Sequence, residues 1–205
     1  MRKLLSANFS RLWRSRLLRI EMLIAIAMAG LLLFVNQFEG ASSIKYMDYP
    51  YFSQFIYNPV VFAAFITLFI GTEYSDGAIR NKLSTGHSRL SVYGSNLCVS
   101  IIMSVLFVLV QIAVCLSIGL LVFEPFRLPM EQIMAAAMTA CLTAASSAAI
   151  YTAMAMNIQN KASSVITAVA LNFAVMLLVS MIAGTLYAPE MVYEYTEKTA
   201  TGLTY

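Results

Sequence analysis

The chain has 205 residues, of which 60% are hydrophobic and only 11% are charged. Its mean hydropathy is +0.77, and its formal net charge is +3. Soluble domains contain about 25% charged residues, so this composition excludes a water-soluble enzyme, and the chain is also too apolar to be disordered. The sequence therefore predicts an integral membrane protein.

Residues 1–19 carry six Lys and Arg residues and no acid. Apolar residues recur at helical spacing among them, at Leu5, Phe9, Leu12 and Trp13, which predicts an amphipathic helix in the membrane interface. Basic side chains would then lie near anionic lipid. A plain basic segment at the membrane edge is the alternative. The expected membrane-interface residues are Arg11, Trp13, Arg14 and Arg16.

Charged residues are absent from five stretches of 17 to 34 residues. About 20 apolar residues in a helix cross the hydrocarbon core of a bilayer, and a helix satisfies its own backbone hydrogen bonds there. None of the stretches alternates apolar and polar residues as a barrel strand does. We predict an all-α, polytopic transmembrane helix bundle in which residues 1–205 form a single transmembrane domain, with spans at about 20–36, 55–72, 95–123, 131–156 and 162–187.

The spans differ in composition. Small residues dominate the fourth span between 135 and 149, which favours close packing inside the bundle. The third span is rich in Val, Ile and Leu and suits lipid contact. Asn58 and Pro59 predict a kink near the outer end of the second span.

Lys and Arg residues are unevenly distributed between the two sides of the membrane. Ten lie on the side of the N-terminus and three on the other side. By the positive-inside rule the N-terminus is cytoplasmic. An odd number of spans then places the tail, residues 188–205, outside the cell.

The sequence contains little that points to catalysis. It has no Gly-x-x-x-x-Gly-Lys-Ser/Thr motif, so the chain has no P-loop of its own. Its three cysteines are interpreted as buried apolar side chains, and His87 as a solvated turn residue without ligand neighbours. We expect no catalytic residue, no metal, no cofactor and no nucleic-acid partner.

Ionisable residues are also absent from the interiors of the predicted spans, with Glu21 placed at the inner edge of the first. Carriers coupled to ion gradients usually need such groups at membrane depth. The neutral polar residues of the spans, such as Asn58 and Gln111, are interpreted as contacts between helices, with a weakly polar path as the alternative.

The only elaborate polar stretch is the cytoplasmic segment 73–94. Ser75 or Asp76 is a candidate helix cap, and Thr85-Gly86 is a helix end. These signals predict a two-turn helix between the second and third spans, and Ser88 or Ser91 then begins the third. Such a helix suits a lever that transmits a partner's motion, or an interfacial anchor for the loop.

The motif Glu73-Tyr74-x-x-Gly77-x-x-Arg80 resembles the first cytoplasmic loop of ABC-2-type transporter permeases, notably the bacterial bacitracin and lantibiotic-immunity type. In that family the loop forms a coupling helix that docks into a separate ATP-binding cassette ATPase. The basic N-terminal helix is similar to the family's elbow helix. The resemblance implies a partner-binding segment containing Glu73, Asp76, Gly77, Ile79, Arg80, Lys82 and Leu83.

The resemblance further implies a permease subunit of a bacterial exporter in the inner membrane, paired as a homodimer or heterodimer. Its cargo would be an amphipathic drug, an antimicrobial peptide or a lipid-like molecule, moving along the first, second and fifth spans. The family has six spans, so we expect the last one to be lacking. Two other functions stay open, a non-transporting membrane partner or sensor that recruits a cytoplasmic protein, and an intramembrane enzyme.

Overall fold

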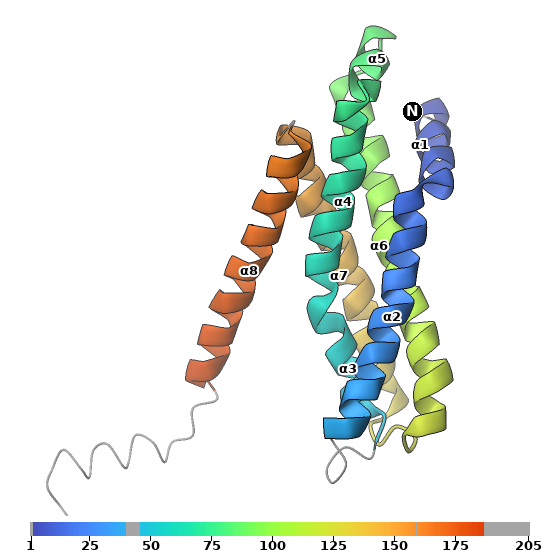
Figure 1. The fold of residues 1–205 in the computed structure, drawn as a ribbon, viewed down its shortest axis with the longest axis vertical. Helices are drawn as coiled ribbons and strands as arrows, with labels where there is room; N and C mark the ends of the chain where they lie inside the picture. Colours follow the sequence, from blue (N-terminus) through green and yellow to red (C-terminus); the bar gives the residue numbers. More distant parts are fainter. Residues whose placement is uncertain (1, 40–45, 159, 187–205) are drawn as a thin grey trace, which may run out of the picture. The chain divides into compact units, whose positions relative to one another are not determined.

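The computed structural model describes residues 2–39, 46–158 and 160–186 (Figure 1). The chain falls into two compact units, Met1–Val169 and Ala170–Tyr205. The described residues form an all-α structure and contain no β-strand beyond a single bridge between Tyr46 and Glu124. The predicted fold class is confirmed. The elements are α1 (Arg2–Arg14), α2 (Arg16–Glu39), α3 (Asp48–Ser53), the 3-10 turn η1 (Gln54–Tyr57), α4 (Asn58–Ser75), α5 (Ala78–Ser84), α6 (Arg89–Val122), α7 (Met130–Asn157) and α8 (Lys161–Leu186).

Five helical segments are long and apolar enough to cross a membrane, as predicted. They are Arg16–Phe38, Asp48–Ser75, Arg89–Val122, Met130–Asn157 and Lys161–Leu186. The second consists of α3, η1 and α4, so the helix is irregular directly before Pro59, where the sequence predicted a kink. The predicted tail, residues 188–205, lies outside the described residues.

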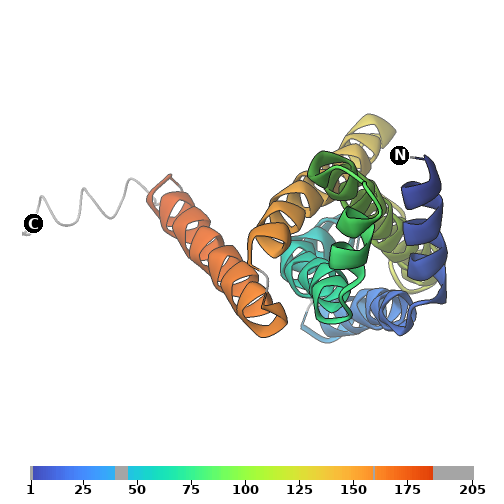
Figure 2. The same ribbon diagram turned by 90° about the horizontal axis from the view of Figure 1, so that it is seen from above.

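In the first unit, α2, α4, α6 and α7 form one bundle (Figure 2). Its centre is aromatic and aliphatic, and Phe62 of α4 meets Phe107 of α6 edge to face at 5.4 Å between ring centroids. In the second unit, residues 170–186 continue α8 as an apolar helix. We call the two ends of the bundle inner and outer, following the predicted topology.

The fourth span was predicted to be buried in the bundle, and this prediction is wrong in degree. Only one side of α7 is buried, through Ala140, Ala144 and Ala148, whereas Thr139 and Thr143 on another side are exposed. The second span is buried over 44% of its most apolar window and α7 over 28%. Small residues allow close approach only on the side that meets a neighbour, so composition alone overstated the burial of α7.

At the outer end, the segment before α3 is bonded to the loop between α6 and α7. The backbone N–H of Met47 donates to the carbonyl oxygen of Glu124 at 3.0 Å. The carboxylate of Asp48 accepts from the backbone N–H groups of Arg127 at 3.2 Å and Leu128 at 3.3 Å. We call these three hydrogen bonds the outer latch.

Candidate functional site

The junction between α4 and α5 depends on a left-handed glycine. Gly77 has φ of +68°, a conformation that costs a residue with a Cβ about 1–2 kcal/mol. It separates the end of α4 at Ser75 from the start of α5 at Ala78, so the chain turns there without a longer loop. The predicted two-turn helix is present as α5, and it ends at Thr85 and Gly86 as expected.

The predicted cap of this helix is wrong. The Ser75 hydroxyl donates back to the carbonyl oxygen of Gly71 at 2.7 Å, and Asp76 lies in the link after α4. Gly77 occupies the cap position and supplies no side chain. The next predicted helix start is present, because Ser88 caps α6 by accepting from the N–H of Ser91 at 3.2 Å.

Glu73, on the last turn of α4, is 1% exposed and lies between two cations. Its carboxylate is 2.8 Å from Arg11 of α1 and also accepts from the Lys82 ammonium of α5. The other carboxylate oxygen accepts from the Asn96 amide of α6 at 2.7 Å. One buried carboxylate therefore contacts three other helices.

Asn8 of α1 completes this set of contacts. Its side-chain amide donates to Asn96 at 2.6 Å and to Ser95 at 3.1 Å, and its oxygen accepts from Lys82 at 2.7 Å. We call Asn8, Arg11, Glu73, Lys82 and Asn96 the Glu73 network. Its members come from α1, α4, α5 and α6, so it fixes α5 to the end of the bundle.

Arg11 also contacts Phe69, one turn before Glu73. Its guanidinium lies 4.6 Å from the centre of the Phe69 ring and donates to the Phe69 carbonyl oxygen at 2.9 Å. Charge-assisted hydrogen bonds of this kind are stronger than neutral ones, and a planar guanidinium can both stack and donate. Arg11 was expected to face lipid headgroups, but the structure directs it to Glu73.

The two sides of α1 have different surroundings. Leu4, Asn8 and Leu12 are buried against the protein, whereas Leu5, Phe9 and Trp13 are exposed, with Trp13 66% exposed. The exposed apolar stripe suits lipid, as predicted for an interfacial helix. Leu12 belongs to the other side. Arg14 and Arg16, the remaining predicted interface residues, are exposed.

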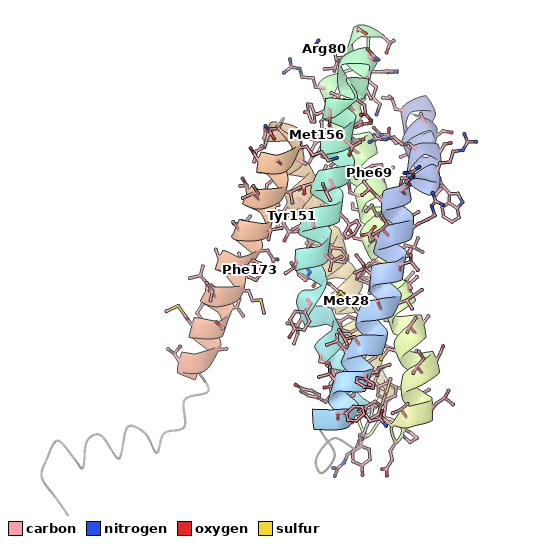
Figure 3. All side chains as sticks on the ribbon, in the orientation of Figure 1. Met28, Phe69, Arg80, Tyr151, Met156 and Phe173 are labelled. Atoms are coloured by element: carbon pink, nitrogen blue, oxygen red, sulfur yellow. The ribbon has the colours of Figure 1, made fainter. Side chains whose placement is uncertain are left out.

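The predicted partner-binding residues fall into two groups. Glu73 and Ile79 are buried, and Gly77, Lys82 and Leu83 are partly buried. Asp76 and Arg80 are exposed, and Arg80 points away from the bundle at its inner tip (Figure 3). The structure thus separates residues that hold α5 in place from residues that a partner can reach.

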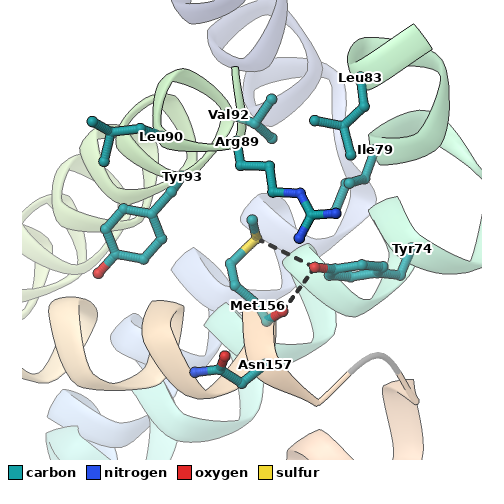
Figure 4. A pocket seen from close by; sticks show the side chains of 9 residues that line it. All are labelled: Tyr74, Ile79, Leu83, Arg89, Leu90, Val92, Tyr93, Met156 and Asn157. Atoms are coloured by element: carbon teal, nitrogen blue, oxygen red, sulfur yellow. Dashed lines mark hydrogen bonds between the residues drawn. The ribbon is translucent and has the colours of Figure 1, made fainter. Parts of the chain in front are cut away.

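Beside α5 lies a groove of about 550 Å³ between α5, the start of α6 and the end of α7 (Figure 4). The Tyr74 hydroxyl donates to the Met156 carbonyl oxygen at 2.8 Å and thereby ties α4 to α7 at this point. The groove is lined by Tyr74, Ile79, Leu83, Arg89, Leu90, Val92, Tyr93, Met156 and Asn157. It presents apolar side chains and one cation toward the inner end.

Glu21 lies on α2, which begins at Arg16, and its position at the inner edge of the first span stays a prediction. Its side chain is completely buried on the same side of α2 as Leu18 and Ala25, and neither carboxylate oxygen has a hydrogen-bond partner among the described residues. The α2 helix therefore contains a buried acid.

The other chemistry-bearing residues are scattered. Across residues 2–39, 46–158 and 160–186, no three His, Cys, Asp or Glu side chains are grouped as metal ligands would be. Cys115 is buried and Cys141 partly buried, but Cys98 is exposed, contrary to the expectation that all three are buried. The structure describes no assembled catalytic set in these ranges.

Sequence reasoning located Glu73 and Lys82 but missed Asn8 and Asn96. The only signal for these two was an amide within an otherwise apolar helical stripe. A family model described as "ABC-2 family transporter protein" matches residues 4–179. No curated protein and no solved structure matches the chain.

Proposed function

The chain belongs to the ABC-2 transporter family, and from this premise we propose that it is the permease subunit of a bacterial exporter in the inner membrane. Membership makes it a multi-pass membrane permease of an ABC transporter, a family that generally works with a separate ATPase subunit. The proposed cargo is an amphipathic drug, an antimicrobial peptide or a lipid-like molecule. The bacitracin and lantibiotic-immunity type is the proposed subfamily.

The observation that supports this proposal is the fixed attachment of α5. The Glu73 network joins α5 to α1, α4 and α6. A short helix held in this way moves together with the helices to which it is bonded. A force applied to α5 by a cytoplasmic partner is therefore transmitted to the second and third spans.

Asp76 and Arg80 form the proposed contact surface for the ATPase, with Leu83 at its edge. Their exposure and opposite charges suit a polar docking surface. Glu73, Ile79 and Lys82 act from beneath by holding α5, and Gly77 permits the turn into it. The N-terminus is then cytoplasmic, and the permease pairs with itself or with a related permease in contact with membrane lipid.

A double charge reversal on the exposed face of α5 tests the proposal. The chain is co-expressed with each ATP-binding cassette protein encoded in neighbouring genes and purified in mild detergent. We expect the wild type to retain one of these ATPases, and Asp76→Arg combined with Arg80→Glu to reduce the retained amount at least tenfold. Both side chains lie outside the Glu73 network, so the fold is preserved.

Arg127→Glu is the matched control, because it reverses a charge at the predicted outer end, beyond the reach of a cytoplasmic protein. It should retain the ATPase at the wild-type level. Full retention by the α5 variant would show that α5 is not the docking element. Retention without transport of any candidate cargo would favour the other proposed role, a membrane partner or sensor that recruits a cytoplasmic protein.

A further inference from the structure

Three neutral amide side chains are buried in the outer half of the bundle, and two of them lack hydrogen-bond partners. Gln54, Asn58 and Gln111 are 1%, 3% and 0% exposed. Both amide atoms of Gln111 and the Oδ1 of Asn58 have no partner among the described residues, whereas Gln54 is hydrogen-bonded to the Cys115 thiol. An amide is polar enough that burial without a partner costs about as much free energy as a lost hydrogen bond. Their burial therefore needs an explanation.

The antiparallel packing of the second and third spans brings these amides together. Glu73 is bonded to Asn96 near the inner end, and Phe62 meets Phe107 midway. Asn58 precedes Phe62 by one helical turn, and Gln111 follows Phe107 by one turn. The same register puts Asn58 and Gln111 at the same level of the two spans.

Gln54 extends the same row by one further turn. It lies against the Cys115 thiol, which follows Gln111 by one turn on α6. Cys115 is itself completely buried. We call Gln54, Asn58 and Gln111 the amide seam. It lies between two helices of one chain and directly at the 3-10 turn η1, where the second span lacks regular helical hydrogen bonding.

We propose that the amide seam is a binding subsite for an uncharged hydrogen-bonding group, an amide or a hydroxyl, of the transported molecule. Amides offer both donors and acceptors, so they complement a peptide bond or an alcohol and offer no charge to balance an ion. The seam binds this group when α4 and α6 separate. This inference rests on the proposed transport function and adds the chemical class that the path recognises.

The chain contains its own reporter for this site. In a variant with Cys98→Ser and Cys141→Ala, Cys115 is the remaining thiol, and it lies against Gln54. The purified chain in lipid nanodiscs is treated with a small water-soluble methanethiosulfonate reagent. We expect slow modification of Cys115, and we expect millimolar N-acetyl-leucinamide, a blocked amino acid with two amide groups, to slow it at least fivefold.

Gln111→Leu, in the same background, removes one amide of the seam while keeping the side-chain size similar. We expect it to abolish the protection by N-acetyl-leucinamide and to raise the thermal unfolding midpoint by about 5 °C, because two orphan atoms leave the core. Asn58→Leu is the second variant and should also abolish protection. Ser104→Ala is the control. Ser104 is equally buried on α6 but already donates to the Ser100 carbonyl oxygen at 3.0 Å, so protection should persist.

Three results would overturn the proposal. Cys115 that stays unmodified for about a day shows that the seam does not open. Modification without protection shows that water alone satisfies the amides. Protection that survives Gln111→Leu shows that the probe binds elsewhere. None of these measurements requires the ATPase, so the subsite can fail while ATPase retention by α5 stands, and the reverse also holds.

Discussion

Replacing Glu73 by glutamine tests how α5 is held. Glutamine keeps the size of the side chain, but its single oxygen can replace only one of the two carboxylate oxygens that accept from Lys82 and Asn96. The substitution therefore removes the negative charge and one of these hydrogen bonds. Arg11 and Lys82 then lie near each other without a counter-charge. We expect α5 to detach more often from the bundle.

The expected magnitude follows from the burial of the three groups. Breaking a buried ion pair by removing one partner costs about 3–5 kcal/mol. The Arg11 and Lys82 side chains are 30% and 15% exposed, so water partly solvates them once the carboxylate is gone, and we place the cost at about 2–3 kcal/mol. At about 1.4 kcal/mol per factor of ten, the open population of α5 rises roughly 30- to 150-fold.

Hydrogen exchange in lipid nanodiscs measures this population directly, because amides exchange when a segment opens locally. The amides of α5 (Ala78–Ser84) should exchange roughly 30- to 150-fold faster in Glu73→Gln than in the wild type, in line with the cost above. Amides at the centre of α6 should change little. Circular dichroism confirms that the variant retains its helices.

Asp76→Asn is the control for this experiment. It also neutralises an acid near α5, but Asp76 is exposed and forms no ion pair within the described residues. Its α5 amides should exchange within about threefold of the wild-type rate, because exposed charges contribute little. Equal exchange in Glu73→Gln and the wild type would refute the idea that the buried carboxylate holds α5.

Three further predictions follow from glycines and from topology. Gly77→Ala should lower the free energy of unfolding, measured by thermal unfolding, by about 1–2 kcal/mol because Gly77 has φ of +68°. Gly30→Ala, whose new methyl group meets open space, should leave stability unchanged or raise it by up to about 1 kcal/mol. A Gly30→Ala variant less stable than Gly77→Ala would contradict the assigned conformations. Gly71→Ala should also destabilise the chain, since its Cβ would lie 3.0–3.2 Å from atoms at the start of α8, and an unchanged midpoint would mean that this close approach relaxes freely. In a background without native cysteines, an impermeant thiol reagent should label Arg127→Cys in intact cells but Arg80→Cys only after permeabilisation; protection of both would contradict the five-span topology.

The spans were predictable because charged side chains are excluded from hydrocarbon regardless of the tertiary fold. The residues at which the helices of the spans begin were harder to predict. Arg16 still favours helix, so α2 begins several residues before its charge-free stretch does, whereas α6 begins after Ser88, one of the two predicted caps. The burial of Glu21 depends on the helices that pack against α2, which a count of charges does not reveal.

The position of α5 was predictable from local signals, but its attachment was not. Asn8 and Asn96 are far apart in the sequence and meet only after α1 packs beside α6. For the same reason Glu73, Arg11 and Lys82 read as three separate charges until the helices are assembled. Residues that bind one another across the fold leave no spacing pattern, whereas Gly77 and Gly86 mark turns that the chain makes by itself.

The outer latch and the Glu73 network hold the second and third spans together at opposite ends. Two helices joined at both ends can separate only if one of them bends between the two connections, and the second span bends most easily at the 3-10 turn η1. Under the proposed transport function, cargo bound at the amide seam would leave only where one of these two connections breaks, so the order of breaking would set the direction of transport.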